Sequence, residues 1–85
     1  MNDLWLINEL AMEYADQNVK HEDALNLINS ALKYEPLNSI FIDTKGWILF
    51  KMNKKEEAKM LFQKSLNLNP NYKDAKEHYR ATLKS

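Results

Sequence analysis

The chain of 85 residues has no cysteine, one glycine and two prolines. Without cysteine there is no disulfide, no thiolate metal ligand and no cysteine nucleophile, and the redox compartment cannot be inferred. The shortage of glycine and proline leaves little room for loops. Val, Ile and Thr are also few, whereas Leu, Ala, Lys, Glu, Met and Asn are common. This balance favours helices over strands, so we predict a single all-α domain.

Long apolar runs and a basic N-terminal segment are also missing, so we expect no signal peptide, no membrane span and a cytoplasmic location by default. The sequence has no glycine-rich phosphate loop and no Ser/His/Asp constellation. His21 and His78 have no partners at metal-ligand spacing, and we interpret both as lone surface histidines. We therefore expect no catalysis, no cofactor and no metal.

The net charge is zero, but the charges are unevenly distributed. Residues 1–43 carry eight acidic and two basic side chains, and residues 44–85 carry four acidic and ten basic ones, so that the two parts have net charges of −6 and +6. Two interpretations stay open: chance distribution over solvated faces, or head-to-tail contact in a homo-oligomer or a longer solenoid. Nucleic-acid binding is a remote alternative, because phosphate binding usually shows as a clearly basic domain.

Apolar residues at helical spacing predict five helices, over about 3–17, 22–34, 39–52, 55–68 and 72–84. Asn2 or Asp3 can cap the first helix, and Asn38 or Ser39 the third.

Asn18 and Asn53 are placed to end the first and third helices in the left-handed conformation, and Pro36 and Pro70 to end the second and fourth. Gly46 lies in the middle of the third helix, where a glycine costs about 1 kcal/mol relative to alanine. We interpret it as the site of close approach by another helix.

Two parts of the chain repeat one another. Six positions recur 34 residues later: Lys20, Glu22, Ala24, Leu27, Leu32 and Pro36 match Lys54, Glu56, Ala58, Leu61, Leu66 and Pro70. The first helices of the two copies align at an offset of 35, so one extra residue falls in the turn around Asn18 to His21. A helix–turn–helix unit of 34 residues is the period of the tetratricopeptide repeat.

The chain resembles the tetratricopeptide repeat family over essentially its whole length. The family signature of small residues, an aromatic and a proline is matched by Gly46, Ala58, Phe62, Ser65 and Pro70 in the second copy. It is matched by Ala11, Ala24, Ala31 and Pro36 in the first copy, where Ile28 replaces the aromatic. The resemblance implies a right-handed α-solenoid with repeat 1 at about 3–36, repeat 2 at about 38–70 and a capping helix at about 72–84.

A finer resemblance links residues 10–24 and the run Asp43-Thr44-Lys45-Gly46-Trp47 to a repeat pair in larger bacterial tetratricopeptide proteins, with Thr44 in place of a serine. Two repeats and one helix fall below the roughly three repeats usually needed for stability. We therefore expect either a longer parent protein or self-association that covers Leu4 and Trp5 at an open N-terminal face.

In this family the first helix of each repeat lines a concave groove. The resemblance places seven partner-binding candidates there: Trp5, Asn8, Met12, Ile40, Asp43, Trp47 and Phe50. Trp and Met are typical of partner-binding surfaces, although some of these residues can instead pack between repeats. The clamp for a peptide carboxylate that some members carry is not matched, since only Asn8 corresponds to it.

We therefore predict a non-catalytic protein–protein interaction module that binds a peptide or helix in an apolar groove. A scaffold that forms a homodimer or larger homo-oligomer through the same surface is the alternative. The identity of a protein or peptide partner is not encoded in any motif.

Overall fold

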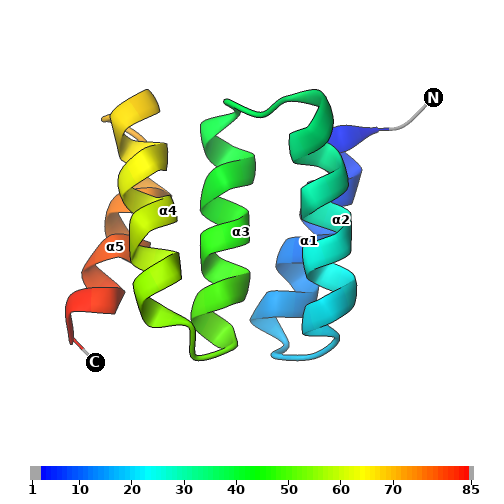
Figure 1. The fold of residues 1–85 in the computed structure, drawn as a ribbon, viewed down its shortest axis with the longest axis horizontal. Helices are drawn as coiled ribbons and strands as arrows, with labels where there is room; N and C mark the ends of the chain where they lie inside the picture. Colours follow the sequence, from blue (N-terminus) through cyan, green and yellow to red (C-terminus); the bar gives the residue numbers. More distant parts are fainter. Residues whose placement is uncertain (1–2, 85) are drawn as a thin grey trace.

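The computed structural model describes residues 3–84, which form five α-helices and no strand. The helices are α1 (Leu4–Asp16), α2 (His21–Tyr34), α3 (Ser39–Lys51), α4 (Lys55–Leu68) and α5 (Lys73–Lys84) (Figure 1). The predicted all-α fold with five helices is confirmed, and each predicted bound lies within one residue of the observed one.

The helices form two layers, and α3 lies at the centre. It packs against all four other helices, whereas α2 packs on α1 and α3, and α4 packs on α3 and α5. Figure 1 shows α2 in front of α1 and α4 in front of α5. Among the described residues, α2 and α4 are not in contact with each other. The chain is therefore two helical hairpins and a fifth helix, arranged in sequence.

Side chains cap the first helix of each hairpin. Asp3 Oδ1 accepts hydrogen bonds from the backbone N–H groups at the start of α1, at 3.0 and 3.1 Å. Asn38 Oδ1 does the same at the start of α3, at 2.9 and 3.1 Å. These bonds satisfy N–H groups that have no partner within a helix. Asn38 rather than Ser39 is thus the cap of α3, and Asn2 lies outside the described residues.

The same two helices end in left-handed asparagines. Asn18 has a φ of 57° and Asn53 a φ of 64°, as predicted. After α3, the N–H of Asn53 donates to the Phe50 carbonyl at 3.0 Å, and the N–H of Lys54 donates to the Leu49 carbonyl at 2.9 Å. This pair of bonds is the Schellman motif, which turns the chain sharply into the next helix.

The turn between α1 and α2 spans residues 17–20, and the turn between α3 and α4 spans residues 52–54. The extra residue of the first turn is therefore where the repeat offset predicts it. It brings a second left-handed residue, Lys20, with a φ of 50°, which the sequence pattern did not indicate.

Gly46 of α3 lies directly against the Phe62 ring of α4. A Cβ atom added to Gly46 would lie 2.6 Å from Cε1 and 2.9 Å from Cδ1 of the Phe62 ring, which is fully buried. In the first hairpin, Ala11 and Ile28 occupy the corresponding positions, and both are fully buried. Ala11 is larger than Gly46, and Ile28 is smaller than Phe62. The two differences in size therefore compensate between the hairpins.

The core forms two clusters. The first includes Phe41 and Ile48 of α3, which pack with buried alanines of α1 and α2. The second contains Leu49, Ala58 and Phe62. The sequence pattern did not single out Phe41 and Ile48 as core residues. Because α3 has neighbours on most sides, its buried positions do not form a single stripe.

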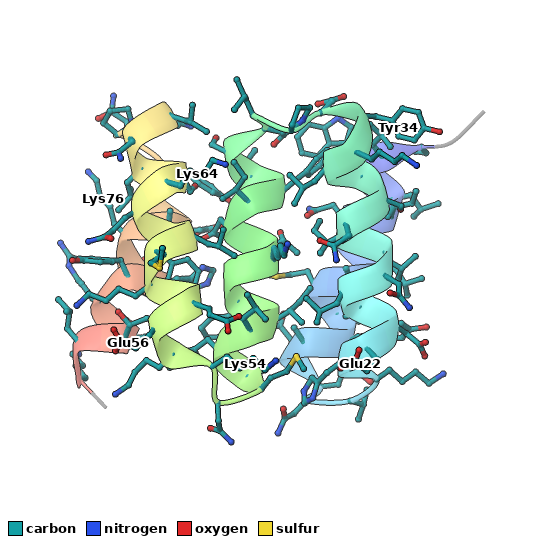
Figure 2. All side chains as sticks on the ribbon, viewed as in Figure 1. Glu22, Tyr34, Lys54, Glu56, Lys64 and Lys76 are labelled. Carbon is teal, nitrogen blue, oxygen red and sulfur yellow. The ribbon has the colours of Figure 1, made fainter. Side chains whose placement is uncertain are left out.

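We predict that Gly46→Ala destabilises the protein by about 1–2 kcal/mol, because overpacking at the Phe62 ring outweighs the gain in helix propensity. The measurement is the free energy of unfolding in urea. Lys64→Ala, at an exposed position on α4 (Figure 2), is the control and should change stability little. A Gly46→Ala protein as stable as the parent would contradict the close-contact explanation.

We also predict that Asn53→Ala costs about 1 kcal/mol, because alanine pays the steric penalty of the left-handed conformation. Asn53→Gly should keep or slightly raise stability, since glycine adopts positive φ freely. Asn67→Ala, at an exposed position inside α4, is the matched control and should cause no loss. Equal unfolding midpoints for the alanine and glycine variants at Asn53 would show that the turn does not depend on this conformation.

Candidate functional site

One face of α1 carries a hollow of about 520 Å³. Its lining residues are separated by one helical turn or adjacent turns, so they share this face: Trp5, Asn8, Glu9, Met12, Glu13, Asp16 and Gln17. Three of the seven predicted partner-binding residues, Trp5, Asn8 and Met12, are brought together here. We call this surface the α1 hollow.

Trp5 is exposed over 52% of its surface, yet it does not hang free. Its ring centroid lies 4.9 Å from that of Phe41, with the rings tilted by 59°. Phe41 is fully buried in the first core cluster. One part of the indole is therefore fixed against α3, while the rest is exposed to solvent.

The charged side chains that line the α1 hollow, Glu9, Glu13 and Asp16, are all acidic. Gln17 Nε2 donates to Glu13 Oε1 at 3.4 Å. Asn8 Oδ1 is buried and has no hydrogen-bond partner among the described residues. The hollow thus presents acceptors and negative charge beside an aromatic ring. Helical periodicity alone could have predicted that these acids share a face with Trp5 and Met12, because they lie one or two turns away from them.

Trp47 joins three helices. Its indole Nε1 donates to Asp16 Oδ1 of α1 at 2.9 Å. Its ring stacks on His78 of α5, at 4.3 Å between centroids, and on Phe50, at 5.4 Å. The Lys51 Nζ lies 4.9 Å from its ring centroid. Trp47 is half-buried, and the buried part of its side chain packs between α1, α3 and α5.

Asp43 is fully buried, with both carboxylate oxygens 3.0 Å from His78 Nδ1. Its predicted position in an open groove is therefore wrong, since no partner can reach the carboxylate. The interpretation of His78 as a lone surface histidine is also wrong, because its side chain is 16% exposed and packs against Trp47 and Phe62. Asp43 and His78 are 35 residues apart in the sequence, so no local sequence pattern indicated that they form a hydrogen bond.

Burial raises the pKa of Asp43 above its ordinary value of 3.8, since a charged carboxylate loses its hydration there. The hydrogen bond and charge of His78 oppose this rise in pKa, and the nearby Asp74 adds to it. Burial also raises the pKa of the Tyr72 hydroxyl, with further contributions from Asp43 and Asp74. The contact between α3 and α5 thus contains a group of coupled polar side chains.

Ile40 and Phe50 are not among the residues that line the α1 hollow. Ile40 is half-buried, and Phe50 lines a separate hollow of about 460 Å³ at the end of the hairpins, with Asn18, Lys51, Asn53 and Lys55. Trp5, Asn8 and Met12 thus line one hollow, whose charged residues are acidic, and Phe50 lines another, which carries two lysines.

The N-terminal face also differs from the prediction. Leu4 packs against the first core cluster, whereas Leu6 and Leu10 are 61% and 39% exposed. Leu10 lines a hollow of about 380 Å³ between α1 and α2. Leu6 and Leu10, together with Trp5, are thus the exposed apolar residues of α1.

No group of three or more His, Cys, Asp or Glu side chains in residues 3–84 is arranged to hold a metal ion. In the same part of the chain, no helix has the length and apolar character needed to span a bilayer.

Neither a protein-family model nor a solved structure matches the chain. Part of the chain is similar to part of protein arginine N-methyltransferase 9. The human protein is 33% identical over 67 residues, which are 79% of this chain and 8% of that protein. The Mus musculus protein is 34% identical over 58 residues, which are 68% of this chain and 7% of that protein. The Xenopus laevis protein is 32% identical over 60 residues, with coverages of 71% and 7%.

The chain thus spans less than a tenth of the length of these relatives. A similarity this partial assigns no catalytic activity to the chain.

We predict that Asp43→Asn changes how stability depends on pH. A carboxyl group with a raised pKa binds its proton more tightly in the folded protein than in the unfolded one. Its contribution to the free energy of unfolding is therefore largest below pH 3.8 and falls as the pH rises through the raised pKa. The unfolding free energy of the parent minus that of Asp43→Asn, measured in urea across this range, should fall as the pH rises. A difference that rises with pH would mean that the lowering of the Asp43 pKa by His78 is larger than the raising of it by burial.

Proposed function

We propose that this chain is a tetratricopeptide-like, non-catalytic interaction module that binds a peptide or helix of another protein on the face of α1. The observation that carries the proposal is Trp5, an exposed tryptophan fixed against the buried Phe41 beside a hollow. Tryptophan is enriched among the residues that dominate binding energy in protein interfaces. A ring that is already held in place loses little conformational entropy on binding.

The repeat pattern supports the tetratricopeptide part of the proposal. The signature positions Ala11, Ala24, Ala31, Gly46, Ala58, Phe62 and Ser65 are all buried, at contacts where helices approach closely. Ser65 Oγ also donates to the Ser39 carbonyl at 2.8 Å, which ties α4 to the start of α3. The successive neighbours α1, α3 and α5 form the layer in which the family's groove would lie.

The test is a selection of binders from a displayed library of short random peptides, followed by calorimetric titration of the selected peptides. Trp5→Ala should weaken binding by tenfold or more, because truncation of a central tryptophan costs about 2 kcal/mol. Tyr34→Ala is the matched control, since Tyr34 is an aromatic residue on α2 that is 67% exposed (Figure 2). It should leave affinity unchanged.

Selected peptides that bind equally well to the parent and to Trp5→Ala would contradict the proposed surface. The mass of the unliganded chain by sedimentation equilibrium addresses self-association, which the opposite charges of the two halves favour. A dimer that is lost in Trp5→Ala would favour that alternative. Nucleic-acid binding has less support, because the acids of the α1 hollow repel phosphates.

A further inference from the structure

We propose that the α1 hollow selects a cationic partner, with an arginine or lysine side chain of the bound peptide lying over Trp5 and between Glu9 and Glu13. This inference rests on the proposed function and adds the chemistry of the partner to it. The charged residues of the hollow are all acidic, and no lysine or arginine belongs to its lining among residues 3–84.

The spacing of the acids favours a bound cation. Glu9 and Glu13 lie one helical turn apart on the same face, and Asp16 follows almost one turn later. Like charges at this spacing repel each other on a helix. A positive charge placed between them relieves the repulsion and gains two charge-assisted hydrogen bonds. Asp16 already accepts the Trp47 indole bond at 2.9 Å, whereas Glu13 accepts only a longer bond of 3.4 Å from Gln17, so Glu9 and Glu13 are the more available pair.

Apolar side chains of the hollow can contact the apolar stem of such a basic side chain. The long apolar stem of an arginine or lysine can pack on Trp5 and Met12 while its charged group stays at the rim. A cation over an indole face is a favourable contact. The chain uses this contact itself, since Lys51 Nζ lies 4.9 Å from the Trp47 ring centroid.

Asn8 adds a polar requirement. Its amide oxygen is buried at the hollow without a donor, and an unsatisfied acceptor is unfavourable. A guanidinium group carries five N–H donors in a planar fork, so it can contact a carboxylate and, once the half-buried Asn8 side chain turns its amide toward the hollow, donate to that oxygen as well. A carboxylate or phosphate from a partner would instead meet acceptors and negative charge throughout the hollow.

The selection described above also tests this inference. Peptides whose binding depends on Trp5 should be enriched in arginine or lysine. The double variant Glu9→Gln/Glu13→Gln should bind a selected peptide about threefold to tenfold more weakly than the parent. Glu22→Gln/Glu56→Gln removes the same charge from the starts of α2 and α4 (Figure 2) and should change affinity by less than about twofold.

Two further measurements separate a charge effect from a loss of folding. Raising NaCl from about 50 mM to about 500 mM should weaken binding to the parent several-fold and to Glu9→Gln/Glu13→Gln much less. Glu13→Lys should reverse the preference between a selected peptide and an analogue with glutamate in place of its basic residue. Urea unfolding of each variant checks that the fold is retained.

Neutral or acidic peptides that depend on Trp5 would overturn the cationic preference and leave the proposed function standing. The absence of any peptide that depends on Trp5 would overturn both. A homodimer that dissociates in Glu9→Gln/Glu13→Gln would identify the occupant as a basic segment of a second copy, and would overturn the proposal of a foreign peptide.

Discussion

The contact between the Gly46 backbone and the Phe62 ring sets the spacing of α3 and α4, and a connected series of contacts follows from it. The ring centroids of Phe62 and His78 are 5.4 Å apart, and the His78 ring stacks on Trp47 with 4.3 Å between centroids. Trp47 in turn donates to Asp16 of α1. The packing of α3 on α4 therefore fixes the position of the Phe62 ring, and this ring contacts His78 of α5. Through Trp47 the same packing also positions α1, which carries the α1 hollow. A side chain at Gly46 would disturb every later step in this series.

Two contacts hold α1 against α3 at opposite ends of the hollow. Near the start of α1, Trp5 packs on Phe41; at its end, Asp16 accepts the bond from Trp47. The face between these points is supported from below by fully buried alanines, Ala11 and Ala15. A partner that binds there would meet a surface whose backbone is already fixed. Affinity would then depend on side-chain chemistry more than on ordering of the helix.

Periodicity predicted the five helices well, because apolar residues recur at helical spacing and the first four helices end at local stop signals, Asn18, Pro36, Asn53 and Pro70. It could not predict the hydrogen-bonded pair of Asp43 and His78. Helical spacing shows which residues share a face of one helix, but not which faces of two helices meet. The burial of Asp43 was missed for the same reason. Membership of the tetratricopeptide family and the bacterial resemblance stay predictions.

Contacts in this protein run only between neighbouring hairpins and helices: α2 and α4 are not in contact among the described residues, and every longer link passes through α3. In such an arrangement the folding free energy is close to a sum of nearest-neighbour terms. Counted over all residues, most contacts are short in sequence, because the helices supply many local ones, and this favours rapid folding. Each hairpin can form locally, and α3, which belongs to the second hairpin and packs against both helices of the first, makes the two transitions cooperative. Partial unfolding should therefore begin at the outer helices and reach α3 last.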